Sequence, residues 1–171
     1  SEGFAKSGGN LDMIQLWVNL PSHAKMTEPR YQELTETNIP EVQLDANQGT
    51  VRVIAGAYDN EHQIAKGPAQ TFSEMNVLDV RLNANALHQF KLNPTWNTMV
   101  FVLSGEIQVD GERYQPMQTL YINLGISEIE INALDDTKLL ILSGEPLNEP
   151  IVAHGPFVMN TEAEIRQAFV D

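Results

Sequence analysis

The residues best suited to chemistry gather in one short stretch, GEPLNEPIVAHGPFVMN at residues 144–160. Glu145 and Glu149 form a pair of carboxylates, and His154 follows closely. Two carboxylates can act as general acid and general base where their surroundings separate their pKa values. One hypothesis is therefore a hydrolase that uses these three side chains. Under it, Glu149→Gln abolishes activity and leaves folding intact.

Proline follows each of the two glutamates, at Pro146 and Pro150. Proline fixes its own backbone and favours an extended conformation in the residue before it. Such a segment suits a fixed path out of a barrel, with its carboxylates accepting hydrogen bonds from exposed backbone N–H groups. We favour this structural role, in which Pro156 stiffens the segment, Gly155 turns it, and Glu149→Gln mainly lowers stability.

Other residue types that do chemistry are scattered. The chain has four histidines, none within ten residues of another: His23, His62, His88 and His154. It has no His-x-His, no His-Glu-x-x-His and no cysteine to complete a zinc site. Ser104 and Ser143 precede glycines but lie outside any nucleophile elbow, and Ser104-Gly105 fits the turn of a hairpin. We therefore assign no catalytic, cofactor-binding or metal-binding residue to this chain.

Composition bounds the partners and the compartment. The 171 residues include 23 acidic and 10 basic ones, for a net charge of −13. Such a surface repels a phosphate backbone, so we expect no direct nucleic-acid binding. No apolar run approaches the roughly 20 residues that span a bilayer, so we expect no membrane partner, and the start shows no signal peptide. The absence of cysteine favours a reducing, cytoplasmic location.

Short strand-like runs follow one another from residue 42 onward. They are VRVIAGAY at 51–58, VLDVRL at 77–82, TMVFVLSG at 98–105, EIQVDG at 106–111, TLYINL at 119–124, SEIEINAL at 127–134 and TKLLILSG at 137–144. Asp110-Gly111 is a strong hairpin signal. Several short strands separated by turn residues predict an antiparallel sandwich or a jelly-roll barrel.

The two ends of the chain differ from this region. We predict a short helix over residues 1–9, a buried strand in MIQLWVNLP at 13–21, and a connector over 22–41. The sequence TEAE is a capping box and predicts a helix over 161–170, packed on the outside of the barrel. The chain opens on Ser1 and not on methionine, so we expect that a preceding part has been removed.

Four long segments in unbroken order resemble the pirin family. They are LWVNLPSHAKMTEPRYQ at 16–32, VRVIAGAYD at 51–59, KGPAQTFSEMNVLDVRL at 66–82 and GEPLNEPIVAHGPFVMNTEAEIRQAF at 144–169. The resemblance implies a bicupin, with two β-barrels in one chain and a C-terminal helix. It implies one iron in the N-terminal barrel, held by three histidines and a glutamate. Bacterial members are associated with quercetin dioxygenase activity, and the animal protein acts as a cofactor of transcription regulators.

The chain departs from the family pattern at the iron site. The family's His-x-His and its later His-x-Glu precede the LWVNLP strand, and neither is present. Glu2 lies too close to Gly8-Gly9 to be the ligand glutamate, so we assign it no ligand role. The resemblance therefore implies a C-terminal portion that lacks the iron-binding N-terminal cupin.

The second barrel also lacks a cupin metal motif. Aligning the strand at 98–105 places Lys91 and Asn93 at the two histidine positions and Asn97 at the glutamate position. A lysine and two amides are poor ligands for iron, so we expect a metal-free barrel without a cofactor. We expect its interior to be filled by side chains such as Trp96, Met99 and Phe101, of which at most one of the last two faces inward.

The resulting prediction is an all-β protein with a cupin-type jelly-roll barrel, an N-terminal linking segment and a C-terminal helix. We divide it into a remnant of the first cupin (1–41), the C-terminal cupin barrel (42–145), and a proline-rich belt with the terminal helix (146–171). The chain alone is not expected to be an enzyme, whereas the intact family member is implied to be an iron-dependent dioxygenase or a transcription cofactor.

Loss of the first barrel should leave an apolar face and the LWVNLP strand exposed, and such surfaces seek partners. We therefore expect a homo-oligomer, an exchange of the N-terminal segment between copies, or pairing with the missing N-terminal cupin half. The alternative is an independent cupin module that binds a small molecule or a protein. A ligand-sized cavity inside the barrel would favour that alternative.

Overall fold

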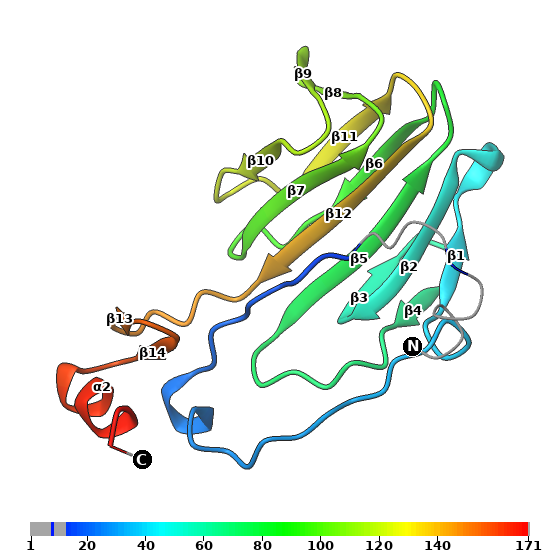
Figure 1. Cartoon of the computed structure of the whole chain (residues 1–171). Coiled ribbons are helices and arrows are strands. Elements are labelled where there is room, and N and C mark those ends of the chain that lie inside the picture. Colours follow the sequence, from blue (N-terminus) through cyan, green and yellow to red (C-terminus); the bar gives the residue numbers. More distant parts are fainter. Residues whose placement is uncertain (1–7, 9–12, 171) are drawn as a thin grey trace.

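The computed structural model describes residue 8 and residues 13–170 of the chain. Two antiparallel sheets packed face to face dominate this part (Figure 1). The helix predicted over residues 1–9 lies outside the described residues, apart from Gly8, and so does Glu2. The expectation of an all-β antiparallel fold is confirmed.

The larger sheet has six strands in the described part of the chain. Their order across the sheet is β1 (Glu41–Gln43), β2 (Gly49–Ala55), β5 (Met75–Leu82), β12 (Thr137–Gly144), β7 (Asn97–Ser104) and β10 (Thr119–Ile122). β12 therefore pairs with β5 on one side and with β7 on the other, although both precede it by many residues. Such crossovers are typical of a jelly roll.

The smaller sheet has four strands in the same part of the chain. Its order is β6 (Leu87–Lys91), β11 (Glu128–Ala133), β8 (Ile107–Val109) and β9 (Glu112–Tyr114). A separate short hairpin of β3 (Ala57–Asp59) and β4 (Ile64–Lys66) lies beside β2. The runs predicted between residues 51 and 144 are all present as strands, with the first divided at Gly56 into β2 and β3.

Two turns show why glycine occupies particular positions. Asp110 and Gly111 have φ angles of 50° and 85° and close the β8–β9 hairpin, as the Asp-Gly pair predicts. The predicted hairpin at Ser104-Gly105 is wrong, because this turn carries the chain from β7 in one sheet to β8 in the other. Gly105 has a φ of 79°, and a Cβ there would lie 2.5 Å from Thr137 Oγ1. The sharp crossing therefore requires glycine.

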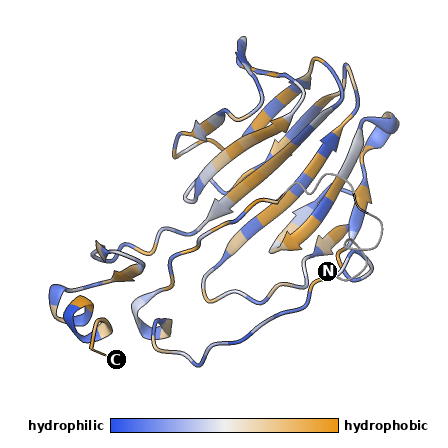
Figure 2. Cartoon of the chain, in the orientation of Figure 1, coloured by the Kyte–Doolittle hydropathy of each residue, from blue (hydrophilic) through white to orange (hydrophobic). Residues whose placement is uncertain are grey.

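The core lies between the two sheets. Hydrophobic and hydrophilic residues alternate along the long strands in Figure 2, so one side of each strand faces inward. The largest fully buried side chains are Phe90, Leu82, Ile107, Ile131, Leu139 and Ile141, followed by valines of β1, β2, β5 and β7. These apolar side chains fill the space between the sheets.

The residues predicted to fill this interior are not the ones that do so. Met99 and Phe101 are two positions apart on β7, so both point to the same face, and that face is the outer one. Val100 and Val102, each 0% exposed, point inward instead. Trp96 precedes β7 and is only partly buried. The three residues predicted for the interior lie outside the buried core.

The segment at residues 13–21 is not a buried strand, contrary to the prediction. It runs past the outer face of the six-stranded sheet (dark blue in Figure 1) without strand pairing. Met13 and Trp17 are 71% and 79% exposed. The apolar run suggested a strand, but a strand needs an edge to pair with, and this segment has no backbone hydrogen bond to one within the described residues.

After β12 the chain leaves the sandwich. Residues 145–151 are irregular and lead into a hairpin of β13 (Val152–His154) and β14 (Phe157–Met159), followed by α2 (Glu162–Ala168). Gly155, with a φ of 56°, and Pro156 form the hairpin turn. We call residues 145–170 the C-terminal lobe.

The C-terminal helix begins where the capping box predicts. The Thr161 hydroxyl accepts a hydrogen bond from the Glu164 backbone N–H at 3.2 Å. However, α2 packs on β13 and β14, with Ile165 buried, and not on the outside of the barrel. Figure 1 shows the helix apart from the two sheets, which corrects this part of the prediction.

Candidate functional site

Glu149 of the C-terminal lobe holds three segments together. Its carboxylate accepts hydrogen bonds from the Ser22 backbone N–H at 2.8 Å, the Ser22 hydroxyl at 3.0 Å and the Asn160 side-chain amide at 3.0 Å. Ser22 begins the short 3-10 turn η1 (Ser22–Ala24), and Asn160 lies just before α2. We call these three residues the Glu149 clasp. The expectation that a belt glutamate accepts from an exposed backbone N–H is confirmed.

The clasp favours the charged form of its carboxylate. Partial burial would raise the pKa of Glu149, but the hydrogen bonds from Ser22 and Asn160 outweigh it and hold this pKa below its usual value. A second tie runs nearby, because Lys25 Nζ donates to the Val158 carbonyl oxygen at 3.0 Å and to Asn19 Oδ1 at 2.7 Å. The N-terminal connector and the C-terminal lobe are thus bound to each other by polar contacts.

The three residues of the hydrolase hypothesis do not form one constellation. Glu145 and Glu149 line the same groove, but the Glu149 oxygens are occupied by the clasp. His154 is outside the groove lining, and its ring packs edge-on against Phe169 at 5.4 Å between centroids. A base and an acid that face different neighbours cannot act on one substrate bond.

The groove has a volume of about 550 Å³. Its walls are residues 16–19 of the N-terminal segment, the outer face of the six-stranded sheet, and residues 145–151 at the start of the C-terminal lobe. The apolar residues that line it include Leu16, Trp17, Val18, Met75, Val77, Met99, Leu142 and Ile151. It lies on the surface of the sheet and not between the two sheets.

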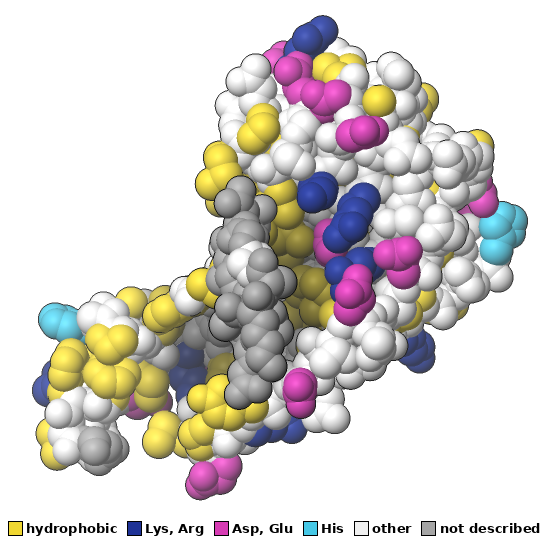
Figure 3. Space-filling model, turned by 45° about the vertical axis from the view of Figure 1, so that its right-hand side comes forward, with side chains coloured by type: hydrophobic (Ala, Val, Ile, Leu, Met, Phe, Trp, Pro, Cys, Tyr) yellow, Lys and Arg dark blue, Asp and Glu magenta, His cyan; other side chains and the backbone are white. Residues whose placement is uncertain are grey.

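The floor of the groove continues as an apolar row across four strands. Val77 of β5 lies opposite Leu142 of β12, Leu142 lies opposite Met99 of β7, and Met99 lies opposite Tyr121 of β10. We call these four residues the apolar row. Tyr121 is 71% exposed. Figure 3 shows hydrophobic side chains gathered on this side of the molecule. Such a surface is typical of an interface.

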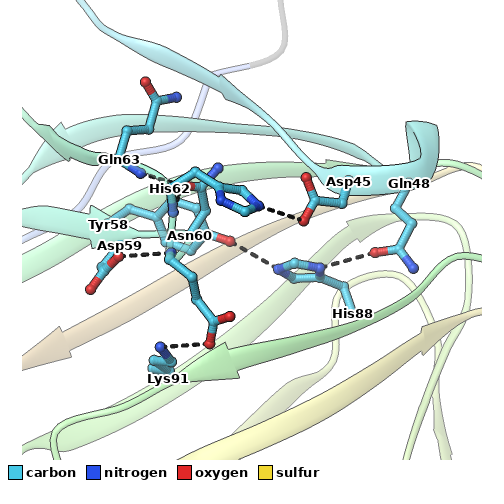
Figure 4. A network of polar contacts seen from close by, with 10 residues as sticks. Asp45, Gln48, Tyr58, Asp59, Asn60, His62, Gln63, His88 and Lys91 are labelled. Atoms are coloured by element: carbon cyan, nitrogen blue, oxygen red, sulfur yellow. Dashed lines mark hydrogen bonds and ion pairs between the residues drawn. The ribbon is translucent and has the colours of Figure 1, made fainter.

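A second, smaller pocket of about 280 Å³ lies where β3 and β6 approach each other (Figure 4). The Tyr58 hydroxyl and His88 Nε2 are 2.9 Å apart, and His88 Nδ1 and Gln48 Oε1 are 3.0 Å apart. Burial, helped by Asp45 and Asp59, raises the pKa of Tyr58 to about 12. The phenol therefore stays protonated and donates to Nε2, which makes Nδ1–H the donor to Gln48.

Two charged pairs lie at this pocket, whereas Asp59 and Glu128, which also line it, form no ion pair in the described part of the chain. Lys91 and Glu61 form an ion pair at 2.9 Å, and His62 and Asp45 lie 3.5 Å apart. The hydrogen bond with Lys91 lowers the pKa of Glu61, and the same bond raises the pKa of Lys91. This network satisfies its own polar groups, as a structural network does.

Only neutral His88 can accept a hydrogen bond from the Tyr58 hydroxyl, which gives a prediction for acid stability. Burial lowers the pKa of His88, with Asp45 acting in the opposite direction. Because the pKa of His88 is lower in the folded protein than in the unfolded chain, neutral His88 stabilises the fold fully above the ordinary histidine pKa. This stabilisation is lost as the pH falls through the pKa of His88 in the folded protein. We expect wild type to lose more stability between pH 7.5 and pH 5 than His88→Gln, in urea unfolding.

The exposed Gln89, which follows His88 on β6, provides the control. Gln89→Ala removes no titratable group, so it should lose stability on acidification to the same extent as wild type. Equal losses in wild type and His88→Gln would contradict the role given to the neutral imidazole.

Among the described residues, the positions aligned with the cupin metal motif do not fit iron. Phe90 and Leu92 pack against the core, whereas Lys91 and Asn93 are exposed. Lys91 and Asn93 therefore do not face inward, as the alignment with the two histidine positions would require, and the side chains of Phe90 and Leu92 carry no ligand atom. His88, which shares the face of Phe90 on β6, contacts Tyr58 and Gln48. Within residues 13–170, no three His, Cys, Asp or Glu side chains are grouped as metal ligands. The metal-free barrel stays a prediction that this donor set supports.

No sequence pattern predicts two of these features. Tyr58, His88 and Gln48 are separated by 30 and 40 residues and meet only because β3 approaches β6. The apolar row depends on the registers of four strands. The Glu149 clasp could be anticipated in part, because each glutamate precedes a proline in an exposed belt.

The two sheets and their jelly-roll crossovers define the class of protein as a cupin. The model of the family described as "Pirin C-terminal cupin domain" matches residues 77–171, which is more than half of the chain. This chain therefore belongs to the pirin C-terminal cupin family. Among the described residues, no helix has the length and apolar character needed to cross a bilayer.

Named relatives agree with this assignment. The chain is 45% identical over 171 residues to "Putative quercetin 2,3-dioxygenase PA2418" of Pseudomonas aeruginosa, covering 100% of this chain and 58% of that protein. It is 36% identical over 163 residues to human pirin, covering 92% of this chain and 54% of pirin. The chain thus spans about half the length of the curated relatives it matches, and it corresponds to their C-terminal half.

A solved structure shows the same fold. The crystal structure of a quercetin 2,3-dioxygenase from Acinetobacter baumannii superposes with a TM-score of 0.85 at 44% identity. The match covers 91% of this chain and 53% of that protein. The expected cupin-type jelly roll is confirmed.

Proposed function

We propose that this chain is the metal-free structural half of a pirin-type bicupin and that it docks an iron-carrying N-terminal cupin. The single observation that carries this proposal is the apolar surface formed by the N-terminal segment and the apolar row. Trp17 is 79% exposed and Met13 is 71% exposed. A chain with a net charge of −13 that leaves such side chains in water has an interface left uncovered.

The C-terminal lobe supports the same proposal. It projects from the sandwich in Figure 1, and Phe169 and Ile151 are 57% and 69% exposed. In a bicupin of the length of the relatives, a lobe of this kind would extend over the neighbouring barrel. The filled interior of the present barrel supports a scaffold role over a cupin module with an internal ligand.

The activity of the intact protein follows from the proposed pairing. The Pseudomonas aeruginosa relative and the Acinetobacter baumannii protein both carry quercetin 2,3-dioxygenase in their names, and we propose that chemistry for the intact protein, with the iron in the N-terminal cupin. The transcription-cofactor role that the pirin resemblance implies is the other candidate for the intact protein. This chain would support either activity by holding the first barrel. A cytoplasmic location stays our prediction.

A mixing experiment tests the docking. The full chain is titrated with the N-terminal half of the Pseudomonas aeruginosa relative, after circular dichroism has established that this half is folded. We expect a one-to-one complex by light scattering and a blue shift of tryptophan emission as Trp17 becomes buried. Trp17→Phe should abolish most of the shift, and Trp96→Phe should retain it.

Two results would contradict the proposal. One is the absence of a complex at micromolar concentrations of both folded halves. The other is a stable homodimer of this chain that buries Trp17 and excludes the added half, which would instead favour self-association through the same face.

A further inference from the structure

Basic side chains gather on the outer face of the six-stranded sheet, beside the apolar row. Arg81 of β5 lies directly opposite Lys138 of β12. Arg52 of β2 lies opposite Asp79 of β5, in the next row of the same face. Figure 3 shows basic side chains next to hydrophobic ones on this side of the molecule. We call Arg81 and Lys138 the basic pair.

The basic pair has no counter-charge of its own within residues 13–170. Arg52 forms an ion pair with Asp79 at 3.5 Å, but neither Arg81 nor Lys138 forms a salt bridge there, and both are exposed. The chain has 10 basic residues against 23 acidic ones. Two adjacent, uncompensated cations are therefore unusual on this surface. Their position on the proposed docking face suggests that the counter-charge comes from the partner.

The basic pair and the apolar row lie close enough together for a single interface to cover both. Lys138, Leu140 and Leu142 are alternate residues of β12, and all three point outward. At about 3.3 Å per residue, the basic pair lies roughly 13 Å along the strand from the apolar row. An interface of standard size, about 800 Å² per partner, covers both at once. Between them lie Leu140 and Phe101, which are opposite each other and half-buried.

We propose that the N-terminal cupin docks on this face with carboxylates opposite Arg81 and Lys138 and with apolar side chains over the apolar row. This inference rests on the proposed function and adds the chemistry that selects the partner. Complementary charges at the edge of an apolar contact raise the association rate and fix the register of docking. The partner surface is therefore acidic where it meets the C-terminal end of β5 and the N-terminal end of β12, which carry Arg81 and Lys138.

Other occupants fit less well. A second copy of this chain also carries a net charge of −13, so two copies repel each other as they approach. A nucleic acid would face the same repulsion from the whole chain, and two cations offer few phosphate contacts. An acidic patch on a neutral or basic partner avoids both problems.

Charge reversal tests this inference. The dissociation constant of the full chain with the N-terminal half of the Pseudomonas aeruginosa relative is measured by calorimetry at 50 and 300 mM salt. The test variant is the double change Arg81→Glu and Lys138→Glu, and a milder variant has glutamine at both positions. The matched control is Lys66→Glu, because Lys66 is exposed on β4 and forms no ion pair in the described part of the chain.

We expect the double charge reversal to weaken binding at least about tenfold at low salt. The glutamine variant should lose most of the salt dependence seen in wild type, and the control should bind as wild type does. Circular dichroism and thermal melting verify that each variant is folded. The glutamine variant keeps the test valid if the reversal variant does not fold.

The outcomes separate the two proposals. If wild type binds and the glutamine and reversal variants bind within about twofold of it, the acidic partner surface is wrong and the docking stands. If Lys66→Glu weakens binding as much as the double variant, net charge and not the basic pair is responsible, and the inference also fails. If the wild-type chain does not bind the folded half at all, both proposals fall together.

Discussion

Phe90→Ala is expected to lower the free energy of unfolding by about 3–5 kcal/mol, measured by urea denaturation. Phe90 is 1% exposed, and its ring packs against Tyr58 at 6.2 Å and against His88 at 4.7 Å between centroids. Removing the ring leaves a cavity in a close-packed interior, and the surrounding strands can collapse into it only in part. The loss is a large fraction of the roughly 5–15 kcal/mol that holds a domain folded.

The control for this prediction is Tyr121→Ala. Tyr121 is also an aromatic strand residue, but it is 71% exposed on the outer face, so its loss should change stability little. A cost of under about 1 kcal/mol for Phe90→Ala would mean that the interior is loosely filled. The alternative of a cupin module with an internal ligand cavity would then become the better explanation.

Phe90 lies on β6, a strand that could not be predicted from the sequence, whereas several other strands could be. Strands with clear apolar runs, such as β5, β7 and β12, could be predicted because alternation along the chain is a local signal. β6 was missed because LHQFK carries two apolar residues among polar ones and pairs with β11, which lies far away in sequence. Hydrophobicity favours Phe90 over Lys91 as the inward residue, but only the pairing with β11 establishes that this segment is a strand.

The prediction of a buried strand at residues 13–21 was wrong for a different reason. Its residues are apolar enough for a buried strand, and Leu16 and Val18 do line the groove. Burial, however, depends on a partner edge, which is a property of the whole assembly and not of the segment. The same limit applies to Met99 and Phe101, whose outward direction follows from the register of β7 with β12 and β10.

The clasp could be predicted in part, although its partner Ser22 could not. The pairing joins residues 127 positions apart, and no local pattern encodes it. The Glu-Pro steps did indicate an extended belt with outward carboxylates. The path of the connector places the Ser22 backbone N–H beside Glu149, and this path could not be predicted from the sequence.

Glu149→Gln is expected to loosen the C-terminal lobe while the sandwich stays intact. Glutamine keeps one acceptor oxygen, which can replace Oε2 and accept from the Ser22 backbone N–H and the Asn160 amide, while its NH₂ group faces the Ser22 hydroxyl. The negative charge that strengthens all three hydrogen bonds is lost. Amide hydrogen exchange should therefore become faster in β13, β14 and α2 and stay unchanged in β5, β7 and β12. Glu145→Gln is the matched control, because this neighbouring carboxylate is exposed.

Acid should produce the same loosening in wild type. The pKa of Glu149 lies below its usual value of 4.5, so the carboxylate's contribution is fully present above pH 4.5 and is lost as the pH falls through the lower, folded value. Beyond the intrinsic change in amide exchange, the lobe of Glu149→Gln should show less of this pH dependence than wild type. The remainder comes from Glu164, because the hydrogen bond from Thr161 lowers the pKa of Glu164 as well. Identical exchange in wild type and Glu149→Gln, or an equal effect of Glu145→Gln, would rule out the clasp.

The clasp experiment also decides between the structural and the hydrolytic explanation of the belt. A catalytic Glu149 would give a variant with wild-type exchange and no activity, because an isosteric amide removes the acid without disturbing the fold. If Glu149 acts as a clasp, Glu149→Gln instead shows faster amide exchange in the C-terminal lobe. In the proposed bicupin that lobe reaches toward the first barrel, so Glu149→Gln should also weaken docking, and Asn160→Ala should do so by the same route because it removes another member of the clasp.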